Sequence, residues 1–206
     1  MKRTTAAWVL FALAAAIARA DVNGGDSALE HGDYAAAARE FRAGAEEGNA
    51  LAQLKLAALY ARGRGVAKND VEAAKWYRKA ADQGNAQAQY NLAVMYLQGL
   101  GIAKDRVAAA AWMRKAAEQA YAAAQAWLGY MYVTGQGVDR DDAEGAEWYR
   151  KAADQGNPEA QYGLGQLYAQ GRGVEMSEAE AILWYRKAAE QGNVRARNAL
   201  NRLGVQ

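Results

Sequence analysis

Residues 76–85 of the chain read WYRKAADQGN, and residues 148–157 read WYRKAADQGN again. Residues 184–193 read WYRKAAEQGN, and residues 112–121, at the same phase, read WMRKAAEQAY. The tryptophans that open these four stretches are spaced 36 residues apart. A fixed period of this size is typical of stacked helical hairpins, in which each copy buries its apolar face against the next copy.

Each repeat begins with a predicted helix that carries its largest apolar side chains on one face. In the first repeat these are Ala52, Leu56, Leu59 and Tyr60, and the same spacing recurs in the other three. Intervals of four and three residues place such side chains on one side of a helix. A Gly ends each helix and another follows two residues later, which indicates backbone positions with positive φ rather than a phosphate-binding loop. The pairs are Gly63/Gly65, Gly99/Gly101, Gly135/Gly137 and Gly171/Gly173.

A second predicted helix in each repeat starts at a residue that caps helix N-termini well. These N-caps are Asn69, Asp105, Asp141 and Ser177. A Glu three residues later, present in three of the four repeats, predicts a reciprocal capping box. We therefore interpret the neighbouring carboxylates Asp141 and Asp142 as part of a helix start rather than as an acid–base pair. We expect this helix to bury its Trp and its Ala-Ala pair. Its Arg-Lys pair is expected to form a solvated ridge, with a site for an anionic polymer as the alternative.

The first twenty residues form a separate segment. It has two basic residues, Lys2 and Arg3, then an apolar run over residues 6–17, and an Ala-Arg-Ala site that ends at Ala20. This is the pattern of a secretory signal peptide. We expect residues 1–20 to be cleaved after Ala20, which leaves a periplasmic or secreted chain with no membrane span. An uncleaved anchor is the alternative.

The rest of the chain fits one repeat frame. Residues 21–49 align with the second half of a repeat and are predicted to cap the stack at its start. Residues 194–206 supply one last helix that closes it, with its arginines facing water. Four repeats lie between the caps, at residues 50–85, 86–121, 122–157 and 158–193.

Composition argues against several classes of function. Three of the 25 basic side chains lie in the signal segment, against none of the 23 acidic ones, so the remainder gives no charge argument for nucleic-acid binding. The chain has no cysteine, which excludes disulfides and thiol nucleophiles. His31 is the only histidine, and neither Ser27 nor Ser177 is set with a base and an orienting acid. We therefore predict no catalytic residue, no metal site and no cofactor.

The repeated motifs closely resemble the Sel1-like repeat family, a relative of the tetratricopeptide repeats. They are Leu-x-x-x-Tyr, Gly-x-Gly-Val and Trp-Tyr-x-Lys-Ala-Ala-x-Gln-Gly, and the resemblance covers residues 33–203. It implies an all-α fold, a right-handed superhelical solenoid of stacked helix-turn-helix repeats. It also implies a non-enzymatic adaptor that binds a protein partner, in bacteria often in the periplasm. Some cysteine-rich members are linked to penicillin binding or β-lactamase activity, which the cysteine-free chain does not inherit.

The repeats differ most on the face of the first helices that lies opposite the shared core. All but one of these positions are apolar or aromatic, and in a solenoid this face lines a concave groove. An exposed apolar groove marks a protein-binding site. The alternative is that neighbouring helices bury much of this face. The predicted contact residues are Leu54, Tyr90, Val94, Leu97, Tyr121, Trp127, Tyr130, Val133, Tyr162 and Gln166.

The stretch at residues 112–121 breaks the pattern at two positions. Ala120 stands where the other copies have Gly, and Tyr121 stands where they have Asn. A non-glycine residue in the left-handed conformation costs about 1 kcal/mol, and a missing N-cap costs about as much. We expect this junction to be strained or to turn differently. Tyr121 would then belong to a partner-binding patch or a soft hinge, and compensation by packing is the alternative.

Two further functions stay open beside the adaptor. One is an enzyme that acts on cell-wall peptides, although the chain shows no nucleophile or metal set for it. The other is a cell-wall module that binds peptidoglycan. Binding to purified peptidoglycan would separate such a module from a protein adaptor.

Overall fold

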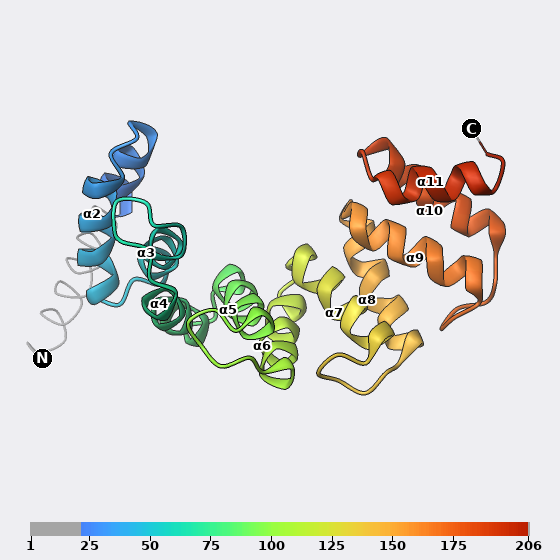
Figure 1. Cartoon of the computed structure of the whole chain (residues 1–206), viewed down its shortest axis with the longest axis horizontal. Helices are drawn as coiled ribbons and strands as arrows, with labels where there is room; N and C mark the ends of the chain where they lie inside the picture. Colours follow the sequence, from blue (N-terminus) through green and yellow to red (C-terminus); the bar gives the residue numbers. More distant parts are fainter. Residues whose placement is uncertain (1–21, 206) are drawn as a thin grey trace, which may run out of the picture. The chain divides into compact units, whose positions relative to one another are not determined.

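The computed structural model of the chain describes residues 22–205, and every regular element within them is a helix (Figure 1). Residues 22–30 are helical, and the helices after them alternate between two types. The second-type helices are α2 (Tyr34–Glu46), α4 (Asp70–Asp82), α6 (Arg106–Glu118), α8 (Asp142–Asp154) and α10 (Glu178–Glu190). The first-type helices are α3 (Ala50–Arg62), α5 (Ala86–Gln98), α7 (Ala122–Thr134), α9 (Pro158–Gln170) and α11 (Val194–Arg202). The signal segment predicted at residues 1–20 lies outside the described residues.

Two compact units divide the chain between Lys104 and Asp105. In the first unit α2 packs against α3, α3 against α4 and α4 against α5. In the second unit α6 to α11 pack consecutively in the same way, and α7 also contacts α9. Contacts of this kind, limited to neighbouring elements, define a solenoid of stacked helical hairpins. The all-α solenoid expected from the sequence is therefore confirmed.

The apolar positions shared by the repeats form the core, with one correction to the sequence-based expectation. The leucines of the first-type helices are fully buried: Leu56, Leu92, Leu128 and Leu164. On the second-type helices the residue after the tryptophan is buried in every repeat: Tyr77, Met113, Tyr149 and Tyr185. The tryptophan itself is buried only at Trp148 and Trp184. Trp76 and Trp112 are half-buried, and the Lys79 ammonium lies 3.9 Å from the centre of the Trp76 ring.

The second-type helices α4, α6, α8 and α10 start at the predicted N-caps, but the capping box is wrong. The side chains of Asn69, Asp105, Asp141 and Ser177 accept hydrogen bonds from the first turn as expected. The backbone N–H of Asp141, however, donates to the carbonyl oxygen of Tyr132 at 3.1 Å. Asn69 and Ser177 donate in the same way to the tyrosines that precede them, Tyr60 and Tyr168. The cap therefore closes the hairpin onto its own first helix, and Glu144 instead accepts the Trp148 indole N–H at 2.9 Å.

The turn inside each hairpin depends on its second glycine. Gly173 has a φ of +68°, which favours glycine. A Cβ at Gly173 would also lie only 2.1 Å from the carbonyl oxygen of Asp142, at the start of α8. The corresponding glycines make the same close approach to the preceding second-type helix: Gly65, Gly101 and Gly137. This position thus lets consecutive hairpins touch backbone to backbone.

A buried glutamine on α9 binds both the preceding helix and the glutamine near the end of its own repeat. Gln161 on α9 is only 4% exposed. Its Nε2 donates to the carbonyl oxygen of Ala153 at 3.2 Å, and its Oε1 accepts from Gln191 Nε2 at 2.8 Å. The same carbonyl contact recurs at the other copies: Gln53, Gln89 and Gln125. The Gln of the repeated phrase is therefore a partner for a buried amide, which sequence analysis missed.

Three of the four arginines of the repeated phrase bind a tyrosine instead of standing in the solvated ridge that we expected, whereas Arg186 and the four lysines are exposed. Arg150 is half-buried, and its Nη2 donates to the Tyr168 hydroxyl of the next first-type helix at 2.7 Å. Its guanidinium carbon also lies 5.8 Å from the centre of that ring. Equivalent pairs form at Arg42–Tyr60, Arg78–Tyr96 and Arg114–Tyr132. These arginines therefore hold adjacent hairpins together.

The irregular junction before α7 keeps the turn of the other junctions. Ala120 has a φ of +60°, and among residues 22–205 it is the only non-glycine residue at positive φ. Tyr121 is the N-cap of α7 and makes no side-chain capping hydrogen bond. Asparagine side chains cap the other first-type helices: Asn49, Asn85, Asn157 and Asn193. Of the two outcomes expected from the sequence, the strained junction is the one observed.

Restoring the regular residues is therefore expected to stabilise the fold. Ala120→Gly should relieve the left-handed strain, and Tyr121→Asn should supply a cap, each raising the free energy of unfolding by about 1 kcal/mol. Urea unfolding of the purified chain measures both effects. As a control, Ala117→Gly inside α6 should lower stability, because Gly costs about 1 kcal/mol in a helix interior. An unchanged unfolding midpoint in Ala120→Gly would contradict the strain at this junction.

Candidate protein-binding site

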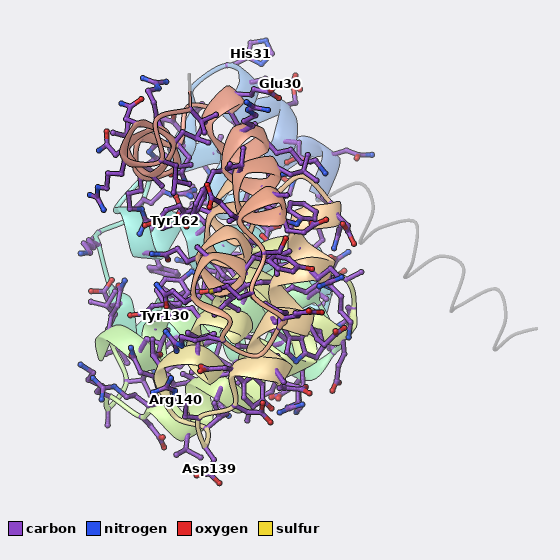
Figure 2. The ribbon with its side chains drawn as sticks, turned by 90° about the vertical axis from the view of Figure 1, so that its right-hand side faces the viewer. Glu30, His31, Tyr130, Asp139, Arg140 and Tyr162 are labelled. Carbon is purple, nitrogen blue, oxygen red and sulfur yellow. The ribbon has the colours of Figure 1, made fainter. Side chains whose placement is uncertain are left out.

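Four of the ten predicted contact residues come together in one pocket of the second unit. Trp127 and Tyr130 project from α7, and Tyr162 and Gln166 project from α9. The pocket has a volume of ≈ 490 Å³, within the range of roughly 300–1,000 Å³ that ligand pockets occupy. The rest of its lining is Ala126, Tyr149, Glu159, Gly163 and Arg195. We call this site the aromatic pocket, and Figure 2 shows Tyr130 and Tyr162 on the same side of the chain.

The other predicted residues lie elsewhere. Val133 packs against the core of the second unit, where a Cβ on Gly145 would lie 2.6 Å from it. Tyr121 is the N-cap of α7, outside the pocket lining. In the first unit Leu54 is buried and lines a different pocket of ≈ 510 Å³. The half-buried residues of α5 also belong to the first unit: Tyr90, Val94 and Leu97.

Glycines within the first-type helices make room for the Tyr149 ring that lines the aromatic pocket. Tyr149 of α8 lines it while only 8% exposed. A Cβ on Gly163 would lie 2.7 Å from the Tyr149 ring, and one on Gly129 would lie 2.8 Å from it. Helices α3 and α5 contain no glycine. Because Gly inside a helix costs about 1 kcal/mol relative to Ala, these glycines were the sequence signal that could have located the pocket.

The aromatic walls combine exposed rings with supported ones. Trp127 and Tyr130 meet edge to face, with ring centroids 5.7 Å apart and planes at 86°. They are 39% and 41% exposed, and the Tyr130 hydroxyl accepts from Gln136 Nε2 at 3.2 Å. Tyr162 packs against the buried Tyr185 ring at a centroid distance of 5.8 Å. The pocket therefore has two exposed aromatic rings, Trp127 and Tyr130, and a third ring, Tyr162, that is supported by the core.

The charge of the pocket lies at one edge. Arg195 of α11 and Glu159 of α9 form an ion pair there, and Glu159 Oε1 also accepts from Asn193 Nδ2 at 3.0 Å. The guanidinium carbon of Arg195 lies 4.9 Å from the centre of the Tyr162 ring. Burial raises the pKa of Tyr149 well above its ordinary value, so this phenol stays neutral at physiological pH. Sequence analysis did not predict that Glu159 and Arg195 belong to the site.

The side chains that could suggest catalysis, a histidine and a pair of carboxylates, make contacts that stabilise the local backbone or helix. His31 is exposed, and its Nδ1 lies 2.8 Å from the carbonyl oxygen of Ser27 (Figure 2). Asp141 caps α8. Within residues 22–205 no group of three or more His, Cys, Asp or Glu side chains is placed to hold a metal ion. None of the helices described is long and apolar enough to cross a membrane.

Asp142 is held by two arginines. Arg172 donates to its carboxylate from Nη2 at 2.7 Å and from Nε at 2.9 Å. Arg140 adds a further contact from Nη2 at 2.8 Å. These hydrogen bonds hold the pKa of Asp142 well below its usual range. The hydrogen bonds from Arg172 have the largest effect, and those from Arg140 the next largest. Arg172 follows α9 and Asp142 begins α8, so the pair links consecutive hairpins.

The low pKa of Asp142 predicts a specific pH dependence. A lowered folded-state pKa contributes stability that is fully present above the ordinary pKa of about 4. This contribution is lost as the pH falls through the folded-state pKa. We expect Asp142→Asn to cost about 1 kcal/mol at neutral pH, and this cost to shrink below pH ~4. Urea unfolding at neutral and acidic pH, with the exposed neighbour Asp139→Asn as control, measures it; a cost independent of pH would contradict the role of this carboxylate.

Neighbour-to-neighbour packing of two-helix units places the chain among the helical-repeat solenoid proteins. The family model described as Sel1 repeat matches residues 50–85, 86–121, 122–157 and 158–193. The chain belongs to the Sel1 repeat family, whose members are generally scaffolds for protein–protein interaction and generally not enzymes.

Solved structures similar to this chain include two with more than a third of residues identical. The first is c5321, a protective antigen present in uropathogenic Escherichia coli strains, with 37% identity and a TM-score of 0.85. That match covers 89% of this chain and 40% of c5321. The second is a Sel1 repeat protein from Oxalobacter formigenes, with 38% identity over 85% of this chain and 70% of that one, and a TM-score of 0.80. This chain thus spans well under half the length of c5321. Comparison with curated proteins gave no match.

Proposed function

We propose that the chain is an exported, non-enzymatic scaffold of the bacterial envelope. It binds a segment of a protein partner along its first-type helices, and by doing so assembles or regulates a complex. The observation that carries this proposal is the aromatic pocket between α7 and α9. Two large aromatic side chains of its lining, Trp127 and Tyr130, are exposed. Such side chains dominate the energetics of protein interfaces.

The place of the pocket in the repeat supports the same function. The shared leucines of the first-type helices are buried in the core, and apart from Tyr149 the pocket is lined from positions where the repeats differ. Varied side chains over a common frame are what a scaffold needs to select one partner. Export rests on the signal pattern of residues 1–20, and it is tested by the N-terminus of the chain recovered from cells, which we expect at Asp21.

A photo-crosslinking amino acid at Tyr130 tests the proposed binding. We expect it to capture a polypeptide in intact cells, and we expect Trp127→Ala in the same chain to reduce the yield. Leu183 on α10 is a matched control, because it is 45% exposed, similar to Tyr130, and lies outside the pocket. Equal capture from both positions would contradict the proposal. Capture of peptidoglycan fragments alone at Tyr130 would replace the adaptor by a cell-wall-binding module.

A further inference from the structure

We propose that the aromatic pocket binds a partner segment in which an aromatic residue stands next to an acidic one. The aromatic side chain enters the pocket, and Arg195 binds the neighbouring carboxylate. This inference rests on the proposed function, because it specifies the chemistry of the protein segment that the scaffold would bind.

The shape of the pocket favours an aromatic side chain. Its ≈ 490 Å³ leave room for a side chain as large as an aromatic one. Tyr149 lies beneath, and Trp127 and Tyr130 already stand edge to face, 39% and 41% exposed. A further ring can add to this group in the same edge-to-face geometry, which aromatic pairs prefer.

The charge around the pocket favours an acidic neighbour for that ring. Helix α11, which contributes Arg195, reads VRARNALNR and carries three arginines and no acid. Glu159 is the acidic residue of the lining, and it is already bonded to both Arg195 and Asn193. A helix that carries three arginines, beside a pocket whose one lining acid is already bonded, attracts carboxylates and repels cations.

The guanidinium of Arg195 has N–H donors left over to bind a second carboxylate. Its ion pair with Glu159 uses Nη2, whereas a guanidinium carries five N–H donors in a fixed fork. Its position over the Tyr162 ring fixes the direction of that fork. If a partner carboxylate displaces Glu159, the Oε1 of Glu159 keeps its hydrogen bond from Asn193. The exchange of partners therefore leaves no charged group without a hydrogen bond.

A cationic partner is the competing chemistry, because aromatic rings attract cations. The face of Tyr162 that would receive such a cation is occupied by the guanidinium of Arg195. An incoming cation would have to displace Arg195 and meet the positive charge of α11. The arrangement therefore favours the acidic segment.

Selection from a phage library of random short peptides on the purified chain tests the inference. We expect enriched peptides to carry Trp, Tyr or Phe with Asp or Glu within two positions. For a synthetic enriched peptide, replacing that acid by its amide should weaken binding roughly tenfold or more. Arg195→Glu should reverse the preference toward Lys or Arg beside the ring. Arg197→Glu makes the same charge change on the same helix outside the pocket, and it should leave the acidic preference intact.

The outcomes separate this inference from the proposed function. Enriched peptides without an acidic preference, or with a basic one, would overturn the inference and leave the scaffold function standing. Enriched peptides that bind Trp127→Ala as well as the parent chain would overturn the pocket as their site. An absence of any enriched peptide would contradict the proposed function itself. Helical circular dichroism confirms the fold of each variant, and Arg195→Gln, which adds no negative charge, should also lose the acidic preference.

Discussion

Gly173→Ala is expected to lower the free energy of unfolding by about 2–5 kcal/mol. An alanine there would have to hold a φ of +68°, which costs about 1–2 kcal/mol. Its Cβ would also lie 2.1 Å from the carbonyl oxygen of Asp142, so the two hairpins would have to separate. Forcing extra atoms into a packed contact costs about 1–3 kcal/mol. Urea unfolding of the purified chain measures the sum.

Gly156→Ala is the matched control for this prediction. Gly156 lies at the turn between α8 and α9 with a φ of +84°, and a Cβ there would meet nothing within 4 Å. Only the left-handed backbone term remains, so we expect a loss of about 1–2 kcal/mol. If both variants lost the same stability, the backbone contact between consecutive hairpins would not be a significant constraint.

Gln161→Leu is expected to cost about 2–4 kcal/mol. The substitution removes the donor to the buried carbonyl oxygen of Ala153 and the acceptor for Gln191. An unsatisfied buried polar group costs about 1–3 kcal/mol, and the lost hydrogen bond adds roughly 1 kcal/mol. The loss should appear as an earlier midpoint in thermal or urea unfolding.

The same substitution at Gln166 provides the comparison. Gln166 lies on the same helix but is half-buried at the wall of the aromatic pocket. Away from the core, substitutions usually change stability by less than about 0.5 kcal/mol. Comparable losses at Gln161 and Gln166 would show that the buried glutamine contributes no more than a surface one.

Features fixed by nearby residues were predictable from the sequence. The N-cap at Asp141 and the left-handed glycine at Gly171 follow from local backbone chemistry, and the observed caps and φ values agree with them. Ala120 shows the opposite case. Its φ of +60° means that the surrounding repeats impose the left-handed turn on a residue that does not favour it. Local rules were therefore sufficient for the frame of the solenoid.

Features fixed by contacts between repeats were not predictable in the same way. Arg150 and Gln161 are polar residues on predicted helices, and such residues are usually solvated. Only their partners in the neighbouring repeat, the Tyr168 hydroxyl for Arg150 and the carbonyl oxygen of Ala153 for Gln161, give them a structural role. The pocket was foreseen in part. Trp127, Tyr130 and Tyr162 lie on the predicted face, whereas the involvement of Arg195 depends on its contacts across from α11 to Glu159 and Tyr162 of α9.

The regular spacing of the links between hairpins has a consequence for how such chains change over generations. Arg42, Arg78, Arg114 and Arg150 each bind the tyrosine 18 residues further on, in the next repeat. Gln53, Gln125 and Gln161 each bind the glutamine 30 residues further on, in the same repeat. Two adjacent cassettes of 36 residues therefore contain the residues that hold them together. Recombination in phase with this period would add, remove or reorder whole repeats, and the hydrogen bonds between adjacent repeats would form as before. The aromatic pocket is contained in the cassettes 122–157 and 158–193 plus the first turn of α11. Its ligand preference should therefore be transplantable as one contiguous block into another chain of the same period.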